Sequence, residues 1–344
     1  MDKSGHYQAL IDRFRSKRLL VIGDLMLDEF IWGKVSRISP EAPVPILDVS
    51  TQSYYPGGAA NVARNLREFC DTVTIMGVVG NDTHAEVLKS LLIAQEIRLD
   101  GLEQDAGYQT IVKTRLIARQ QHVVRVDRES PVPPPEICRT RALETFERLL
   151  PEVDAIIIED YAKGFLTQDF VDRIGALARR ADKIVTVDPN PRNTLRWSGV
   201  TAVKPNRSEA FHVAGCPPVD VREPVLADPT LKRAGERLLE MWDTEMLLIT
   251  LGEQGMVLFR PEAAPYAVAP CPREVFDLSG AGDTAIALFT LALAAGGEPE
   301  VAAEVANHAG SVVVGKLGTA TLTPAELLAS LEQPTTPHTT RPAP

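Results

Sequence analysis

Short apolar runs rich in valine and isoleucine recur along the chain and alternate with helical patterns. The runs are RLLVIG (18–23), VTIMGVVG (73–80), VDAIIIED (153–160), KIVTVDP (183–189), VTAVKPN (200–206) and MLLITLG (246–252). Strands that are apolar on both faces are typical of parallel sheets covered by helices on both sides. In one helical pattern between the runs, Ala59, Val62, Ala63, Leu66 and Phe69 form a single stripe. We therefore predict an α/β fold with a central, mostly parallel sheet and helices on both faces.

Two segments depart from this alternation. Residues 43–50 and 108–129 alternate polar and apolar side chains in the manner of exposed antiparallel strands. We interpret them as parts of a small β lid, formed from about 36–52 and 107–127 and inserted into a single domain.

The end of that domain carries a helix start signal. Thr323 is followed by Pro324 and, three residues after the threonine, by Glu326, which is the pattern of a capping box. Residues 332–344 have too few apolar side chains to offset the entropy of ordering them, so we expect a disordered tail. The predicted domain spans residues 1–331.

Charge and composition exclude several classes of partner. The formal net charge of −10 disfavours nucleic acid and anionic membranes, which the average field of the protein would repel. The N-terminal segment has no apolar signal core, and no run approaches the ~20 apolar residues that cross a bilayer. The four cysteines stand singly, without the spacing of a metal site. We expect a cytoplasmic protein with reduced thiols that binds neither nucleic acid nor membrane.

The stretch DLSGAGDT (277–284) precedes the long apolar run AIALFTLALAA and predicts the start of a buried helix near Ala281. The first N–H groups of a helix are unpaired, and glycines at this point allow a phosphate to approach them. A carboxylate there would repel a bound phosphate, unless Asp283 faces the attacking hydroxyl and removes its proton as general base. The alternative is that Asp283 is an ordinary helix N-cap.

The chain contains no GxxxxGK[ST] sequence, and no GxGxxG follows the first strand, so neither a P-loop nor a dinucleotide site is supported. The motifs VIGDLMLD, PGGAANVARN, DYAKG, VDP, KPNRSE, TLGEQGM and SGAGDT occur instead, in the order and approximate spacing of the ribokinase-like (PfkB) carbohydrate kinases. The longer strings RISPEAPVPIL, YPGGAANVARNL, EDYAKG and VVVGKLGT resemble the branch that phosphorylates D-glycero-β-D-manno-heptose 7-phosphate. The resemblance covers about residues 18–331.

This resemblance implies a ribokinase-like fold, an ATP-dependent sugar kinase and a general base at Asp283. Gly280, Ala281 and Gly282 would supply the backbone N–H groups that stabilise charge on the transferred phosphoryl group. The implied product is the 1,7-bisphosphate, a precursor of lipopolysaccharide or another surface glycan. Bifunctional members of this branch carry a second, nucleotidyltransferase domain, and we expect this chain to be a stand-alone kinase.

The resemblance also assigns substrate and cofactor residues. Those expected to contact the sugar are Asp24, Asp28, Gly57, Gly58, Asn61, Asp160 and Lys163. Those expected to line the ATP site are Asn206, Glu209, Gly252, Gly255, Asn307 and Gly318, with Asn206 and Glu209 organising Mg²⁺ through water. Asp24 could equally cap a turn. The region around Asp277 resembles a loop that holds a monovalent cation such as K⁺ in several relatives.

A sugar phosphate needs cations at the end far from the reacting hydroxyl. The candidates are Arg64, Lys113, Arg115, Arg119, Lys163 and Arg192. Relatives read DPK where this chain has Asp188, Pro189 and Asn190, and Lys204 and Ser279 replace threonines that are common in relatives. The loss of that lysine keeps open a kinase of another sugar or sugar phosphate, and a non-catalytic sugar-binding module is the third hypothesis. Because lids pair between subunits in relatives, we expect a homodimer formed through the lid.

Overall fold

The main sheet has the predicted α/β architecture. The computed structural model describes residues 3–119, 121–217, 219, 224–271, 276–316, 318 and 320–333. In sheet order the strands are β13 (Tyr266–Val268), β12 (Met256–Phe259), β11 (Met246–Thr250), β10 (Ala202–Val203), β9 (Ile184–Asp188), β8 (Ala155–Glu159), β1 (Arg18–Gly23), β4 (Thr72–Gly80) and β5 (Arg98–Asp105). Neighbouring strands from β11 to β5 are parallel, and β12 and β13 add an antiparallel edge.

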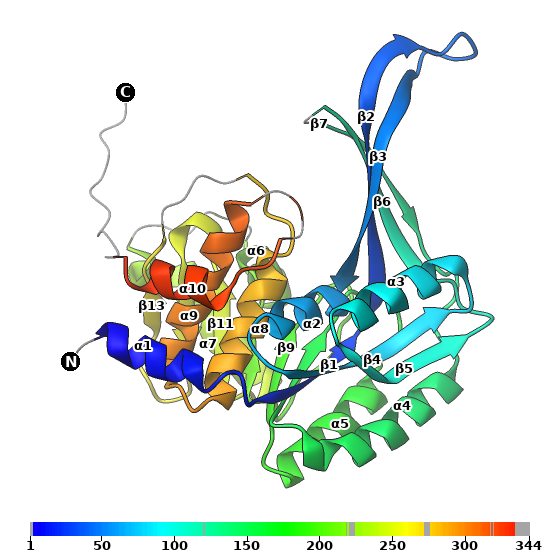
Figure 1. Cartoon of the computed structure of the whole chain (residues 1–344). Helices are drawn as coiled ribbons and strands as arrows, with labels where there is room; N and C mark the ends of the chain where they lie inside the picture. Colours follow the sequence, from blue (N-terminus) through cyan, green and yellow to red (C-terminus); the bar gives the residue numbers. More distant parts are fainter. Residues whose placement is uncertain are drawn as a thin grey trace, which may run out of the picture.

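Helices cover both faces of this sheet (Figure 1). Consecutive residues of β1 alternate between two cores, because side chains along a strand point to opposite faces. Leu19 and Val21 pack with one set of helices, and Leu20 and Ile22 with the other. The first set is α1 (Lys3–Asp12), α2 (Ala59–Arg67), α3 (Thr83–Ala94), α8 (Ala281–Ala294), α9 (Pro299–Val314) and α10 (Pro324–Leu331). The second set is α4 (Glu136–Leu149), α5 (Gln168–Arg180), α6 (Arg207–Val213) and α7 (Pro229–Trp242).

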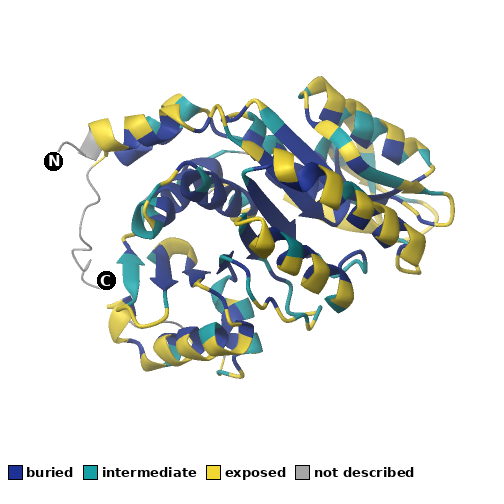
Figure 2. Ribbon diagram, turned by 90° about the horizontal axis from the view of Figure 1, so that it is seen from below, coloured by how far each residue is buried: buried dark blue, intermediate teal, exposed yellow. Residues whose placement is uncertain are grey.

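The most deeply buried helix of the first layer is α8. Its residues from Asp283 to Leu293 are all buried, which matches the long apolar run in the sequence. Figure 2 shows the central sheet and the helices next to it as buried, whereas the outer helices are exposed on one side. The capping box predicted at the last helix is confirmed, because Thr323 and Glu326 bond reciprocally at the start of α10.

A second sheet projects from the main body as a long arm, which we call the lid (Figure 1). Its strands, in order, are β3 (Pro45–Gly58), β2 (Leu25–Ile38), β6 (Ile111–Ala118) and β7 (Gln121–Arg128). The sheet is longer than the two ranges predicted from the sequence, because β2 starts at Leu25, directly after β1, and β3 continues to Gly58. One pairing is also unlike the antiparallel pattern expected, since β2 and β6 are parallel.

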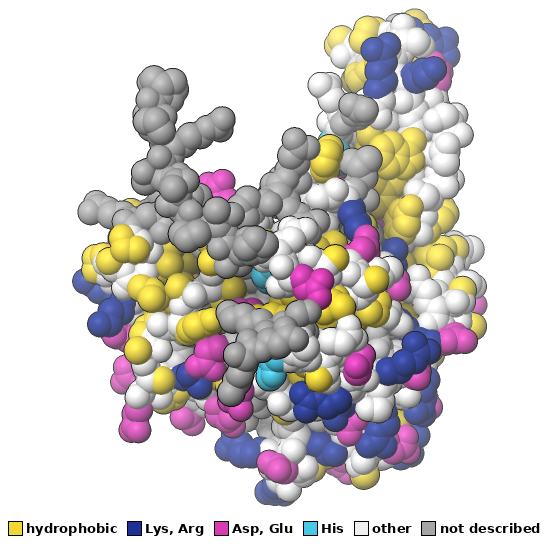
Figure 3. Space-filling model, turned by 60° about the vertical axis from the view of Figure 1, so that its left-hand side comes forward, with side chains coloured by type: hydrophobic (Ala, Val, Ile, Leu, Met, Phe, Trp, Pro, Cys, Tyr) yellow, Lys and Arg dark blue, Asp and Glu magenta, His cyan; other side chains and the backbone are white. Residues whose placement is uncertain are grey.

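The outer strand of the lid is exposed along its whole length. Every residue of β7 is exposed, including Val123, Val124 and Val126. Figure 3 shows hydrophobic side chains along the lid and lysine or arginine side chains near its free end. The predicted tail at 332–344 lies outside the described residues from residue 334 onward. None of the helices that the structure describes is long and apolar enough to cross a membrane.

Candidate active site

The first turn of α8 presents the carboxylate of Asp283 at a helix N-terminus, where the N–H of Ala281 donates to the carbonyl oxygen of Leu278 at 3.4 Å. Gly280 caps the helix in the left-handed region, with φ +80°, and the helix begins at Ala281 as predicted. This conformation favours glycine, and an added Cβ would also lie 2.8 Å from Nδ2 of Asn61. Asp283 stands in the first turn and is not the N-cap, so that alternative interpretation is wrong.

Both oxygens of Asp283 accept hydrogen bonds from side chains far away in the sequence. Nδ2 of Asn61, in α2, donates to Oδ2 at 2.7 Å, and the hydroxyl of Tyr161, after β8, donates to Oδ1 at 2.8 Å. Burial raises the pKa of Asp283, and these two hydrogen bonds act in the opposite direction. The two donors therefore fix the orientation of this buried carboxylate, and their hydrogen bonds favour its charged form.

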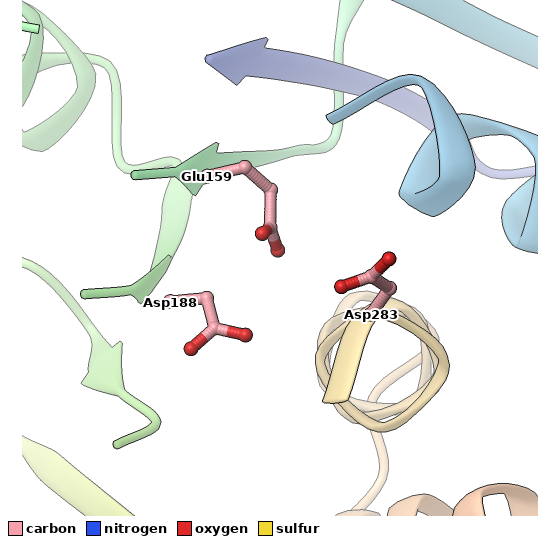
Figure 4. Close-up of side chains that lie close together, drawn as sticks. All are labelled: Glu159, Asp188 and Asp283. Atoms are coloured by element: carbon pink, nitrogen blue, oxygen red, sulfur yellow. The ribbon is translucent and has the colours of Figure 1, made fainter. Parts of the chain in front are cut away.

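Two further carboxylates approach Asp283 from the main sheet. Glu159 ends β8 and Asp188 ends β9, and a carboxylate oxygen from each lies within 4.8 Å of the others and of Asp283 (Figure 4). The carboxyl ends of parallel strands meet at one edge of the sheet, where open α/β folds bind ligands. Glu159 is 1% exposed, and its Oε1 has no hydrogen-bond partner among the described residues.

A buried lysine partly balances this cluster. Nζ of Lys204 lies 2.9 Å from Oδ2 of Asp188, and its side chain is 3% exposed. Burial raises the pKa of Asp188 to about 6, against the attraction of Lys204. Burial and its acidic neighbours also raise the pKa of Glu159 well above its ordinary value. Mg²⁺ prefers oxygen ligands and is commonly held by one or two carboxylates, so Glu159 and Asp188 fit a divalent cation.

A cavity of about 900 Å³ opens at this point. It is lined by Asp283, Gly282, Tyr161, Asp188 and Lys204, together with residues of α6 and of the segment after β11. An added Cβ on Gly282 would lie 3.6 Å from Nζ of Lys204, which places the ammonium opposite the start of α8. The cavity thus brings a helix N-terminus, an ammonium and a carboxylate together, which suits the transfer of an anionic group.

Asn206 and Glu209 also line this cavity, and they form a capping box at the start of α6. Oδ1 of Asn206 accepts from the N–H of Glu209 at 3.0 Å and from the hydroxyl of Ser208 at 2.7 Å. Oε2 of Glu209 accepts from the N–H of Asn206 at 2.8 Å. Asn206 therefore orients Glu209, whose carboxylate can contact a metal-bound water.

A second cavity, of about 860 Å³, shares several lining residues with the first. The predicted ATP-site residues Gly252, Gly255 and Asn307 all line it, beside apolar side chains such as Met256 and Val314. Gly318 does not line either cavity; its N–H donates to Oδ2 of Asp277 at 3.2 Å. The second cavity has the apolar wall that a flat aromatic base requires.

The predicted sugar residues lie where the lid joins the main sheet. Asp28, on β2, is buried and forms an ion pair of 2.5 Å with Arg115 of β6. Gly57 lies against it, since an added Cβ would be 2.5 Å from Oδ2 of Asp28. Gly58 has φ +59° and begins the turn into α2, which carries Asn61.

Asp24 is buried beside the loop DYAKG, residues 160–164, and Asp160 is the buried first residue of that loop. Oδ2 of Asp24 accepts from the N–H groups of Tyr161 at 2.9 Å and of Lys163 at 3.1 Å. This geometry makes Asp24 a support for the loop, in line with the turn-capping alternative. Burial raises the pKa of Asp160 to about 7, and its Oδ2 has no partner among the described residues.

Three of the six candidate cations lie close enough to interact, with Arg115 and Lys163 both acting on Lys113. Lys113 pairs with Asp28 in the register of β6 with β2, and Nζ of Lys113 lies 5.0 Å from the centre of the Tyr161 ring. Burial lowers the pKa of Lys113, and the positive charges of Lys163 and Arg115 act in the same direction. Lys163 pairs with Glu129 at 2.5 Å. Arg119 and Arg192 are exposed, and Arg64 stacks on Tyr55.

Tyr161, Glu159, Asp188 and Lys204 are site residues that the sequence reasoning did not assign. All four follow or end an apolar run, so the edge rule for parallel strands could have found them. That rule singled out only their neighbour Asp160, and Asn206 was singled out because it matches a motif.

Comparison with known proteins identifies the family of this chain. A model described as pfkB family carbohydrate kinase matches residues 16–326. The bifunctional protein HldE of Desulfatibacillum aliphaticivorans is 39% identical over 94% of this chain and 64% of its own length. That of Pelobacter propionicus is 40% identical over 93% of this chain and 64% of its own length. The chain thus spans 64% of the length of each of these relatives, which is less than two thirds.

Solved structures share the fold at much lower identity. A ribokinase from Arabidopsis thaliana, complexed with ribose and ATP, has a TM-score of 0.69 at 17% identity and covers 93% of this chain and 100% of its own. Phosphofructokinase-2 from Escherichia coli, in complex with potassium, has a TM-score of 0.70 at 18% identity and covers 92% and 100%. The ribokinase-like fold class predicted from the sequence is confirmed.

Proposed function

Because this chain belongs to the pfkB family of carbohydrate kinases and is an ATP-dependent enzyme of that class, we propose that its acceptor is D-glycero-β-D-manno-heptose 7-phosphate. Transfer of the terminal phosphoryl group of ATP to the anomeric hydroxyl would give the 1,7-bisphosphate. The observation that carries the proposal is the placement of Asp283 beside the N-terminus of α8, in the wall of a large cavity. The identity to HldE proteins supports the choice of sugar.

Asp283 is the general base of this proposal. It accepts the proton of the anomeric hydroxyl while the oxygen of that hydroxyl bonds to the terminal phosphorus and the bond from phosphorus to ADP breaks. Backbone N–H groups of Gly280, Ala281 and Gly282 stabilise charge on the transferred group, an effect worth ~3 kcal/mol per donor in comparable sites. The ammonium of Lys204 lies opposite Gly282 and supports the same charge.

Mg²⁺ is the metal that this family implies, and the acidic cluster fits it. When bound, it neutralises charge on the ATP phosphates. Glu159 and Asp188 would hold it directly, since Asp188 lines the cavity, Glu159 lies within 4.8 Å of it, and Glu159 has a buried oxygen without a partner among the described residues. Glu209, oriented by Asn206, would act through water.

ATP occupies the paired cavities in this proposal. Its phosphates lie near Gly282, and its base lies against the apolar wall near Gly252, Gly255 and Asn307. A monovalent cation would bind near Asp277, whose carboxylate accepts hydrogen bonds from the N–H groups of Ser279 and Gly318. The potassium named for the phosphofructokinase-2 neighbour supports this last assignment.

The sugar lies between the lid and Asp283. Asp28, Asn61 and Asp160 surround it. Gly57 and Gly58 allow the sugar to approach the backbone, and Asp24 supports the DYAKG loop. Its 7-phosphate contacts the cations gathered on the lid and the DYAKG loop, which are Lys113, Arg115 and Lys163. These can replace the lysine that is absent at Asn190.

The lid has two roles in this proposal. It closes over the sugar and excludes water. It also pairs with the lid of a second subunit, because β7 leaves a strand edge and three exposed valines that a partner would cover. Sedimentation of wild type and of Val124→Asp tests the homodimer, and a monomeric wild type would contradict it.

The alternative acceptor is another sugar or sugar phosphate, and Asn190 is the observation that favours it. A coupled assay of ADP release compares heptose 7-phosphate, the same heptose without phosphate, fructose 6-phosphate and ribose. We expect the highest kcat/KM for heptose 7-phosphate. If fructose 6-phosphate or ribose serves equally well, the choice of sugar is wrong. Binding of a sugar without ADP release from any of them would indicate a non-catalytic module.

A further inference from the structure

The hydroxyl of Tyr161 makes the contact with Asp283 that an acceptor hydroxyl would have to make. We propose that Tyr161 occupies the acceptor position in the sugar-free protein and so suppresses transfer of the phosphoryl group to water. The inference rests on the proposed function, because it takes Asp283 to be the general base. A general base alone would activate water as well as the sugar, and the inference explains how the site distinguishes the two.

Of the two donors to Asp283, only one belongs to the wall of the cavity. Tyr161 lines the cavity of about 900 Å³ together with Asp283, whereas Asn61 is not among the lining residues and is 1% exposed. A water molecule that enters this cavity beside ATP therefore meets Asp283 on the Tyr161 side. Asp283 is itself only 8% exposed, which leaves little room for a second donor there.

The Tyr161 side chain can leave this position without unfolding the loop. Its backbone N–H is fixed by Oδ2 of Asp24 at 2.9 Å, so the anchor of the residue is separate from the contact of its hydroxyl. Rotation of the side chain is sufficient to free Oδ1 of Asp283. A sugar hydroxyl that binds there replaces one O–H donor with another, so the exchange conserves the number of hydrogen bonds.

A lysine of the lid lies on the Tyr161 ring. Nζ of Lys113, on β6, lies 5.0 Å from the ring centre and makes no hydrogen bond or ion pair with any residue that the structure describes. A cation over an aromatic face attracts it. The lid therefore holds the ring in the blocking position until a substrate attracts Lys113 away from it.

Without the Tyr161 hydroxyl, water can take the vacant place. Asp283 would accept a proton from that water, the water oxygen would bond to the terminal phosphorus of ATP, and the bond to ADP would break. The products are ADP and inorganic phosphate, and the proton on Asp283 returns to solvent. Only ATP and water are consumed.

The test compares Tyr161→Phe with wild type for ADP release in the absence of any sugar. We expect hydrolysis to rise about tenfold or more, because a hydrogen bond to a charged group is lost. The ratio of sugar-free to sugar-dependent ADP release should rise by at least a similar factor, since the sugar displaces the hydroxyl in either protein. Tyr266→Phe is the matched control: it removes a tyrosine–carboxylate bond of 2.6 Å to Glu304, outside both cavities, and should leave hydrolysis unchanged.

Two further variants make the result decisive. Asp283→Asn combined with Tyr161→Phe should abolish the added hydrolysis, and Lys113→Gln should raise hydrolysis by itself. Unchanged hydrolysis in both Tyr161→Phe and Lys113→Gln overturns the inference. So does a large loss of sugar-dependent kcat in Tyr161→Phe without added hydrolysis, which would make Tyr161 a positioning residue throughout the reaction. If Asp283→Asn alone leaves sugar phosphorylation intact, the proposed function fails first.

Discussion

Nζ of Lys204 lies 2.9 Å from Oδ2 of Asp188, and both atoms face Gly282 at the start of α8. The pair joins the end of β9 to the segment after β10, so the sheet edge and the helix N-terminus share one ammonium. Asp188 raises the pKa of Lys204, which therefore stays charged despite its burial. The charge of Lys204 is offset by Asp188 and the neighbouring acidic cluster.

Lys204→Met should destabilise the protein strongly at pH 8. Removal of one partner from a buried pair leaves the other charge uncompensated, at a cost of about 3–5 kcal/mol. The loss should be smaller at pH 5, because the pKa of Asp188 is about 6 and the carboxylate is then protonated. Urea unfolding at both pH values measures this. An equal loss at both would show that the ammonium does not act through charge.

Asp160 should make the protein less stable as pH rises. Its pKa is raised to about 7 in the folded state, so the folded protein binds its proton more tightly than the unfolded chain does. That contribution is present in full below the unfolded pKa of about 3.9 and is lost as pH rises through 7. Urea unfolding in EDTA between pH 5 and pH 8 should show a decline that is weaker in Asp160→Asn. Parallel curves would contradict it.

Gly280→Ala should lose both stability and activity. The left-handed conformation costs alanine roughly 1–2 kcal/mol. The new methyl carbon would also lie 2.8 Å from Nδ2 of Asn61 and push that side chain away. Gly215→Ala is the control, since Gly215 also has φ +62° but has only the end of Arg237 within 4 Å. Both variants should lose similar stability, and only Gly280→Ala should lose kinase activity. Equal activities would remove the argument for a glycine cap.

The cations on the lid should select for a phosphorylated acceptor. Lys113→Gln should raise KM for heptose 7-phosphate roughly tenfold or more and change KM for the unphosphorylated heptose little, because charge-assisted contacts are worth about 1.5–3 kcal/mol. Arg119→Gln, an exposed arginine on the same arm, is the control. An equal change for both sugars would place Lys113 away from the phosphate.

Much of the fold follows from local sequence signals. The apolar runs predicted β1, β4, β8, β9 and β11, because buried parallel strands need apolar side chains on both faces. The run at 200–206 predicted a longer strand than β10, which has two residues; Pro205 has no N–H with which to continue the ladder. The glycine-rich stretch predicted the start of α8 because backbone conformation is a local property.

The contacts around Asp283 could not be predicted in this way. Asn61 and Tyr161 are 222 and 122 residues away from it in the chain, and only the stacking of α2, β8 and α8 brings them together. The start of the lid was missed for another reason. The segment from Leu25 is as apolar as β1, so only the change of sheet at Asp24 marks where one strand ends and the next begins.

The most direct test of the central claim is steady-state ADP release by Asp283→Asn with saturating heptose 7-phosphate and MgATP. If Asp283 removes the proton of the acceptor, kcat should fall by about 10²–10⁴ while KM for ATP changes little. The variant should also be at least as stable as wild type at pH 8, because burial raises the pKa of Asp283 and its charge opposes folding. A folded Asp283→Asn protein with kcat close to that of wild type would contradict the account.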